Sequence, residues 1–171
     1  MKILLTGATG GIGSAIKEML KDHQVTCVAH AWIETVDEFD WMICAHGVIN
    51  EEDPLETFMV NTISNIRLAQ TIKAKSIIFI SSTAARGNDM FPIYASSKAA
   101  LNIYAKSIST KRECYVICPG PTDTPLWRKL GIPGQAQSPT AVADAVSRIM
   151  NSSGIYTSGD IITVRNGIIT V

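Results

Sequence analysis

The sequence predicts an α/β protein in which helices cover a mainly parallel sheet. Apolar runs of strand length alternate along the chain with longer segments of helical period, a pattern typical of parallel sheets. A glycine-rich turn separates the first apolar run from the first helical segment. The 171 residues suffice for one substantial core and are few for two, so we expect a single domain over residues 1–171.

The expected elements follow this pattern in chain order. In the first helical segment Ile12, Ile16 and Leu20 recur four residues apart, which predicts a helix over residues 11–21. Six strands are expected at residues 2–6, 25–29, 41–45, 76–81, 114–118 and 160–164, with further helices at residues 55–73 and 93–109.

The last third of the chain begins with a long loop. Residues 119–133 are rich in proline and glycine, and loops of this length in compact domains are often binding lids. Ser138 is typical of a helix N-cap and Pro139 of a first helical turn, so a further helix should begin there and end near Met150.

The charge balance and the apolar pattern exclude several classes of protein. Lys and Arg total 15, as do Asp and Glu, so the net charge is zero and the basic field of nucleic-acid-binding proteins is missing. No apolar run reaches the roughly 20 residues that cross a bilayer. The run after Lys2 stops at Thr6, which is too short for a signal peptide. We therefore expect a cytoplasmic protein with neither a nucleic-acid nor a membrane partner.

The cysteines and histidines show no disulfide or metal-ligand spacing. No C-x-x-C pair occurs, and the cysteines lie in or beside apolar runs, so we expect reduced, buried thiols. The residues concerned are Cys27, Cys44, Cys114 and Cys118, with His23, His30 and His46 scattered among them. No metal site is expected.

The glycine-rich turn predicts a dinucleotide site. Residues 6–13 read TGATGGIG, directly after the first strand and at the start of the first helix. Glycines there allow a tight turn and close approach of a pyrophosphate, and the helix N-terminus favours the anion. The motif at this place therefore indicates a Rossmann-type doubly wound sheet.

Tyr94 and Lys98 form a candidate acid-base pair. They are four residues apart on the helix expected over residues 93–109, so their side chains share one face. A nearby ammonium lowers the pKa of a tyrosine from about 10 toward the working pH, where a general acid-base is most effective. The same spacing also occurs where a packed ring lies beside a solvated amine, so other motifs must support the catalytic interpretation.

Together these motifs resemble those of the short-chain dehydrogenase/reductase family. The resemblance spans residues 6–167, with the motifs in the family's order. They are residues 6–13 for T-G-x-x-x-G-x-G, Asn61 for the asparagine of the preceding helix, residues 80–82 for the serine-bearing strand end, Tyr94 and Lys98 for Y-x-x-x-K, residues 119–124 for P-G-x-x-x-T, and residues 156–167 for the closing strand.

The resemblance implies a role for each matching side chain. Tyr94 would protonate a carbonyl oxygen during reduction, and Lys98 would bind the nicotinamide ribose and lower the pKa of Tyr94. Ser82 would hydrogen-bond the substrate oxygen, and Asn61 would hold a water in the proton relay. Ser81 is an alternative to Ser82, because the stretch from Ser82 to Tyr94 is one residue tighter than the family's usual spacing.

The resemblance also implies an NAD or NADP cofactor. The residue after the second strand normally contacts the ribose, where a carboxylate favours NAD and a basic residue favours NADP. Residues 29–31 (AHA) supply neither a carboxylate nor a strong base. The missing carboxylate favours NADP, and NAD stays open. The cofactor contacts implied are Gly7, Thr9, Gly10, Gly11, Ile12, Gly13, His30, Ala45, Gly47, Tyr94, Lys98, Pro119, Gly120, Thr122 and Thr124.

Two departures from the family's pattern concern the size of the protein. The glycines fit both the 7, 11, 13 spacing of single-domain dehydrogenases and the 7, 10, 13 spacing of epimerases and dehydratases, and the chain length favours the single-domain branch. Residues 30–40 are too few for the family's usual helix and third strand, so both should be reduced or missing. The second strand would then be an exposed edge, with Trp32 covering either that edge or the adenine ring.

A third departure lies at residues 44–47 (CAHG), where the family has N-N-A-G. The glycine is kept, but the amide side chains that brace the sheet are lost. His46 could line the cleft, or it could be a histidine with a structural role.

The sequence thus predicts an NAD(P)-dependent oxidoreductase that interconverts a carbonyl and an alcohol on a small molecule. The alternatives are a non-catalytic NAD(P)-binding sensor and an epimerase or dehydratase with transient hydride transfer. The family resemblance and the apolar helix over residues 93–109 predict a homodimer or homotetramer. Residues 86–93 and 125–137 should select the substrate, and the short loop after Thr124 predicts an open site.

Overall fold

Seven strands form one sheet in the computed structural model, which describes residues 1–28, 37–152 and 154–171. The order is β2-β1-β3-β4-β5-β6-β7, and all neighbours are parallel except β6 and β7. The strands are β1 (Lys2–Thr6), β2 (Gln24–Val28), β3 (Glu38–Cys44), β4 (Lys73–Ile80), β5 (Glu113–Pro119), β6 (Ile161–Arg165) and β7 (Ile168–Thr170). The helices are α1 (Gly11–Met19), α2 (Pro54–Phe58), α3 (Ser64–Thr71), α4 (Pro92–Ile108), α5 (Pro125–Lys129) and α6 (Pro139–Asn151).

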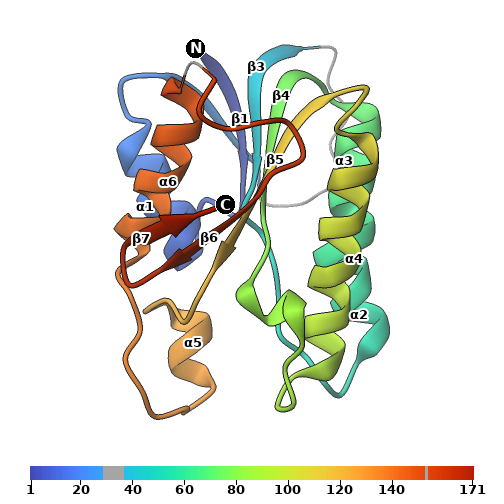
Figure 1. Cartoon of the computed structure of the whole chain (residues 1–171), viewed down its shortest axis with the longest axis vertical. Coiled ribbons are helices and arrows are strands. Elements are labelled where there is room, and N and C mark those ends of the chain that lie inside the picture. The colour runs from blue at the N-terminus through green and yellow to red at the C-terminus, as the bar shows by residue number, and fades with distance from the viewer. Residues whose placement is uncertain (29–36, 153) are drawn as a thin grey trace.

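Helices cover both faces of the sheet (Figure 1). Helices α1 and α6 pack on one face, and α2, α3 and α4 lie over the other. Successive residues of β1 point to opposite sides, so Ile3 and Leu5 join the core with Ile16, whereas Leu4 joins the core with Leu68. Two apolar layers therefore hold the sheet, which confirms the doubly wound α/β class. No helix among the described residues is long and apolar enough to span a membrane.

The C-terminal hairpin adds a seventh strand to the six expected. Asn166 and Gly167 both have positive φ, 51° and 76°, and connect β6 to β7. Two central residues of positive φ are typical of a tight hairpin turn between antiparallel strands. The three residues of β7 are too few for their apolar pattern to predict a strand.

The single helix expected over residues 55–73 is divided into three parts. Asp53 caps α2 by accepting a hydrogen bond from the backbone of Glu56 at 2.9 Å. A π-helical turn, η1 (Met59–Ile63), follows α2 and leads into α3. Strand β4 then begins at Lys73, three residues earlier than expected. The π turn matters because it contains Asn61.

Strand β2 is an exposed edge, as expected from the shortened connection. It pairs with β1 and with no other described strand, and Gln24, Thr26 and Cys27 are exposed. The expectation that all four thiols are buried is therefore wrong for Cys27, whereas the other three are buried and all four are free. Residues 29–36, with His30 and Trp32 and the connection expected to be reduced, lie outside the described residues.

Candidate active site

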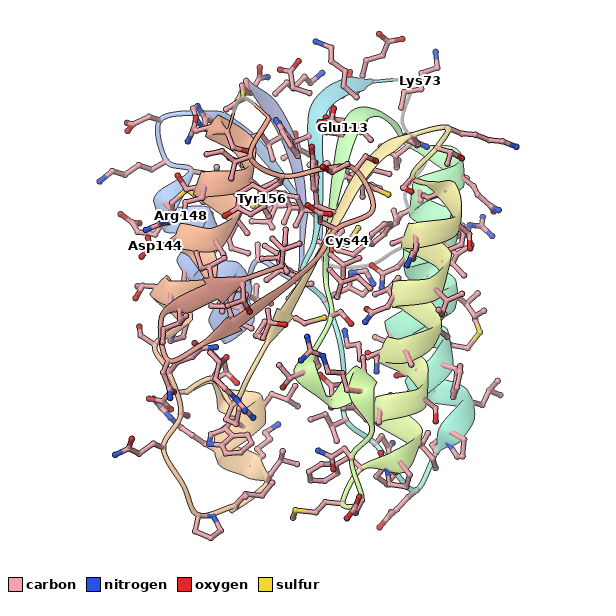
Figure 2. The ribbon with its side chains drawn as sticks, viewed as in Figure 1. Cys44, Lys73, Glu113, Asp144, Arg148 and Tyr156 are labelled. Atoms are coloured by element: carbon pink, nitrogen blue, oxygen red, sulfur yellow. The ribbon has the colours of Figure 1, made fainter. Side chains whose placement is uncertain are left out.

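The candidate site lies at the carboxyl ends of the parallel strands. Figure 2 labels Lys73 and Glu113 at the upper end of the molecule, where β4 and β5 begin, so these strands end toward the lower part of the view. The segments after β1, β3, β4 and β5 meet there, beside α5 and the short 3₁₀ turn η2 (Thr83–Arg86) (Figure 1). Ligands of open α/β sheets bind at this edge.

Three glycines of the loop after β1 have no room for a side chain. Gly7 has φ of +67°, and a Cβ there would lie 2.6 Å from the backbone nitrogen of His46. A Cβ on Gly13 would lie 1.9 Å from the carbonyl oxygen of Gly7, and one on Gly11 would lie 2.6 Å from Cγ2 of Thr124. The crowded positions are 7, 11 and 13, which is the spacing of the single-domain dehydrogenases.

Gly10 meets a different requirement. A Cβ there would lie 3.4 Å from its nearest neighbour, the Gly7 carbonyl oxygen. Gly10 is the N-cap of α1 and supplies no side chain to the first helical N–H groups. Thr9 beside it is exposed, and Ile12 borders the cavity described below. The start of α1 is therefore an open backbone surface with the polarity that favours an anion.

Lys98 is buried beside Tyr94 on α4. Its side-chain nitrogen Nζ lies 5.8 Å from the centre of the Tyr94 ring and donates a hydrogen bond of 3.1 Å to the carbonyl of Ile80. Lys98 is only 3% exposed. Burial lowers the pKa of Lys98 to about 8, although the nearby thiols of Cys118 and Cys44 act in the opposite direction. The expected proximity of phenol and ammonium is thus present.

Tyr94 has a raised pKa where the sequence predicts a lowered one. Burial raises its pKa because the tyrosinate loses hydration, and a hydrogen bond with the Ser82 side chain offsets part of this effect. A tyrosine with a raised pKa is protonated at neutral pH.

The two candidate serines face different neighbours. Ser82 lines the cavity with Tyr94, whose pKa its side chain lowers, and it accepts a hydrogen bond of 3.1 Å from the backbone N–H of Ala84. The buried Ser81 hydroxyl instead faces the carbonyl of Lys98 at 3.4 Å. Successive residues of an extended segment point in opposite directions, which accounts for the difference. The geometry favours Ser82 as the serine beside the acid-base.

Asn61 is fully buried in the π turn η1 and connects three segments. Its Oδ1 accepts a hydrogen bond from the backbone N–H of Val48 at 2.9 Å, and its Nδ2 donates to the carbonyl of Val48 at 2.9 Å and to Oγ of Ser97 at 3.0 Å. Its own carbonyl accepts a hydrogen bond of 2.9 Å from the side chain of Asn65. Asn61 thus ties the loop after β3 to the helix of Tyr94.

His46 bridges β1 and the helical segment of Asn61. Its Nδ1 lies 2.6 Å from the Thr6 hydroxyl and its Nε2 lies 2.7 Å from the Ser64 hydroxyl. The Ser64 hydroxyl donates to the carbonyl of Val60, so the bridge fits a neutral ring that donates from Nε2 and accepts at Nδ1. Burial, with Lys98 nearby, lowers the pKa of His46 to about 4. These contacts support the structural alternative for His46.

The remaining residues expected to contact a cofactor lie around this site, except His30, which is outside the described residues. A Cβ on Gly47 would lie 3.1 Å from Oδ1 of Asn61 and 3.2 Å from Nζ of Lys98, so the absence of a side chain leaves room for both groups. Ala45 borders the glycine loop and donates its backbone N–H to Thr6. Residues 119–124 follow β5, and the Thr122 hydroxyl donates to the carbonyl of Gly120 at 2.8 Å.

A cavity of about 230 Å³ opens in front of Tyr94. Ser81, Ser82 and Tyr94 lie on its polar side, with Pro119, Gly120, Thr122 and Thr124 along the edge nearest α1. Helix α5, which the sequence pattern does not predict, also lines the cavity through Leu126 and Trp127. The loop after Thr124 therefore does contribute a wall to the site, although its short length predicts an open one.

Glu51 is a site residue that the sequence analysis misses. Its carboxylate accepts hydrogen bonds from the backbone N–H groups of Ile93 and Tyr94 at 2.9 and 2.8 Å. The N-cap of α4, Phe91, makes no side-chain cap. Glu51 therefore caps the helix of Tyr94 from a loop 42 residues away, and no local sequence signal indicates such a distant cap.

The protein thus belongs to the class of α/β doubly wound proteins that have a tyrosine, a lysine, a serine and an asparagine at the carboxyl ends of the parallel strands. Residues 22–133 match the short chain dehydrogenase family. The chain belongs to this family. No curated protein sequence matches the chain. In the ranges 1–28, 37–152 and 154–171, no group of three or more His, Cys, Asp or Glu residues is arranged to hold a metal ion.

Solved structures share the fold over nearly the whole chain. The 3-alpha-hydroxysteroid dehydrogenase from Pseudomonas sp. B-0831, complexed with NADH, is 18% identical, with a TM-score of 0.83 over 98% of this chain and 96% of that chain. A short chain dehydrogenase family protein from Francisella tularensis subsp. tularensis SCHU S4 is 20% identical, with a TM-score of 0.81 over 97% of both chains. ElxO with NADP bound is 14% identical, with a TM-score of 0.77 over 98% of both chains.

Proposed function

We propose that the protein is an NAD(P)-dependent oxidoreductase that interconverts a carbonyl and an alcohol on a small molecule, with Tyr94 as the acid-base. The observation that carries this proposal is the arrangement at the cavity. Tyr94 and Ser82 line the same cavity, the Ser82 side chain lowers the Tyr94 pKa against the effect of burial, and the buried ammonium of Lys98 lies 5.8 Å from the Tyr94 ring. A purely structural pair of helical side chains would not require a buried lysine beside a tyrosine that lines a cavity.

The loop after β1 fits a dinucleotide. Gly7 and Gly13 are crowded by backbone, and the start of α1 is open at Gly10, so a pyrophosphate can approach the main chain there. Lys98 would hold the ribose beside Gly47, and residues 119–124 would hold the nicotinamide end. When bound, the nicotinamide would supply hydride to the substrate carbon during reduction and accept it during oxidation.

The protein's own groups would control the proton. Tyr94, which is protonated at neutral pH, donates its proton to the carbonyl oxygen as that oxygen gains negative charge. Ser82 hydrogen-bonds the same oxygen and stabilises the developing charge. Lys98, with a pKa of about 8, carries a positive charge at neutral pH and stabilises the tyrosinate that remains. Asn61 would hold the loop of Gly47 and a water through which Tyr94 regains its proton.

The nucleotide preference stays open between NADP and NAD. Of the structural relatives, one was solved with NADH and another with NADP. The absence of a carboxylate in residues 29–31 removes one source of repulsion of a ribose phosphate, which favours NADP. Titration of the purified protein with each reduced cofactor, followed by tryptophan fluorescence, measures the two affinities directly.

Turnover separates this proposal from its alternatives. With a panel of ketones and aldehydes, an oxidoreductase consumes reduced cofactor in proportion to the alcohol formed. A sensor binds cofactor and consumes none, and Tyr94→Phe changes nothing. An epimerase or dehydratase changes its substrate with no net consumption of cofactor. Consumption that is absent for every carbonyl, despite tight cofactor binding, would contradict the proposal.

We propose that the protein self-associates through an apolar surface, which is smaller than the sequence indicates. On α4, Leu101 is fully buried within its own chain, whereas Ile103 is 65% exposed. Ile63 at the end of the π turn is 43% exposed. We infer a homodimer or homotetramer in which this surface is covered. We also propose that the protein is cytoplasmic and that residues 1–171 form one domain. Sedimentation that shows a monomer at micromolar concentration would contradict the oligomer.

A further inference from the structure

We infer that the substrate is uncharged and carries apolar groups on both sides of its carbonyl. The inference rests on the proposed function, because the carbonyl is placed against Tyr94 and Ser82. It comes from the walls of the cavity in front of these two residues. Outside the polar edge, the cavity is bordered by aliphatic and aromatic side chains from three separate segments. They are Ile49, Met90, Phe91, Leu126, Trp127 and Ile132.

The cavity lining contains no charged side chain among the described residues. Its polar groups away from the cofactor edge are close to Ser82 and Tyr94, with one amide, Asn88, at the far side. The Asn88 Oδ1 already accepts hydrogen bonds of 3.0 Å from the backbones of Met90 and Phe91. The lining therefore provides hydrogen bonds for one oxygen and apolar contact for the rest of a substrate.

The two arginines of the segments expected to select the substrate are bound elsewhere. Arg86 donates through Nη2 to the Thr163 hydroxyl at 2.8 Å, which holds its guanidinium against β6. Arg128 donates to both carboxylate oxygens of Asp123, at 2.6 and 2.9 Å. Neither arginine borders the cavity. A carboxylate or phosphate on the substrate would thus lose hydration without gaining a cationic partner, which is costly.

The first test compares one carbonyl with and without a charge. Levulinate and its methyl ester share the same ketone, and we expect the ester to have a kcat/KM at least about 50-fold higher. Along the series of straight-chain methyl ketones that begins with acetone and butanone, each added methylene should raise kcat/KM by about fourfold until the cavity is filled. Equal rates for levulinate and its ester, or no rise along the series, would overturn the inference.

The second test places a charge on the wall. Met90 borders the cavity but is 62% exposed, so Met90→Arg should fold, and it should raise kcat/KM for levulinate at least about tenfold over Met90→Gln.

Trp127→Ala should lower kcat/KM for the longest ketone by about 10- to 100-fold. Lys106→Ala, an exposed position away from the cavity, should leave it unchanged. A loss of the same size in Lys106→Ala would contradict an apolar wall at Trp127.

A binding measurement separates failure of this inference from failure of the proposed function. If no carbonyl is reduced, the proposed function fails, but the apolar cavity can still be tested by quenching of tryptophan fluorescence. A long-chain secondary alcohol should quench the fluorescence, a hydroxy acid of equal length should not, and Trp127→Phe should abolish the effect. Quenching by neither ligand, or equally by both, would overturn the inference whatever the outcome of the turnover assay.

Discussion

The carboxylate of Glu51 caps the helix that carries Tyr94 by accepting two backbone hydrogen bonds, one of them from Tyr94 itself at 2.8 Å. The second comes from Ile93 at 2.9 Å. Because Pro92 begins the helix and Phe91 offers no cap, these two N–H groups depend on a residue of the loop after β3. The same loop is tied to Asn61 through Val48. The acid-base and the asparagine are thus positioned by one loop.

Removal of this cap should weaken both stability and catalysis. We expect Glu51→Ala to lower the free energy of unfolding by about 1–2 kcal/mol, because two helix N–H groups lose a charged acceptor. Its kcat should fall by about three- to tenfold, since Tyr94 is then held less firmly. Urea unfolding and steady-state kinetics measure the two effects. Glu52→Ala, an exposed neighbour, is the control, and equal effects in the two variants would show that the cap has no special role.

The serines should differ in their importance to turnover. Ser82→Ala removes a donor beside the Tyr94 hydroxyl, and we expect kcat to fall by about 100- to 1,000-fold. Ser81→Ala removes a long contact of 3.4 Å to the Lys98 carbonyl and a contact with the Cys118 thiol, neither of which involves Tyr94, so kcat should fall by less than about fivefold. The ratio of kcat in the two variants is the measurement. A larger loss in Ser81→Ala would assign the role to Ser81 instead.

Replacement of Lys98 should stabilise the fold while abolishing activity. Its folded pKa of about 8 lies below the ordinary 10.5, so the unfolded chain binds the proton more tightly. The stability of the unmodified protein should therefore rise as pH increases from about 8 to 10.5. Lys98→Met should lose this rise and be about 1–2 kcal/mol more stable at pH 7, with at least 100-fold lower kcat.

Thermal unfolding across this pH range is the measurement for Lys98. Lys106→Met, on the exposed side of the same helix, is the matched control and should keep the rise. A Lys98→Met protein that is less stable than the unmodified protein at pH 7 would show that the buried ammonium contributes net stability.

His46 should make the protein sensitive to mild acid. Its pKa is about 4 in the folded state and about 6.5 unfolded, so the unfolded chain binds more protons between these values. Stability should fall as pH decreases from 6.5 toward 4, by about 2 kcal/mol at pH 5. His46→Gln should remove most of this loss, whereas His23→Gln should keep it. Urea unfolding at pH 5 and 7.5 measures the difference, and an unchanged loss in His46→Gln would exclude this residue as its origin.

Local patterns predict much of the fold and of the site. The apolar run of β1 and the regular spacing of Ile12 and Ile16 indicate a strand and a helix through their periods alone. Tyr94 and Lys98 can be paired from the sequence because four residues on a helix correspond to one turn. The crowding at Gly13 is likewise local, because it comes from Gly7 and Ala8 of the same strand-turn-helix unit, whereas Gly7 is crowded by Ala45 and His46 of the segment after β3.

Features that depend on tertiary contacts could not be predicted in this way. The π turn that contains Asn61 has no periodic signal, because it inserts a residue without changing the apolar pattern. The cap by Glu51 and the bridge by His46 join residues 42 and 40 positions apart. The raised pKa of Tyr94 follows from burial, whereas the sequence reveals only the neighbouring lysine. Ser81 and Ser82 differ only in the direction in which each side chain points.

The most direct test of the account is the effect of Tyr94→Phe on turnover and on cofactor affinity, measured in the same preparation. The phenylalanine keeps the ring beside Lys98 and removes only the hydroxyl that bonds with Ser82. We expect kcat/KM for the best ketone to fall by at least about 1,000-fold, while the Kd for reduced cofactor changes by less than about threefold. A variant that retains more than about a tenth of the original kcat/KM would contradict Tyr94 as the acid-base.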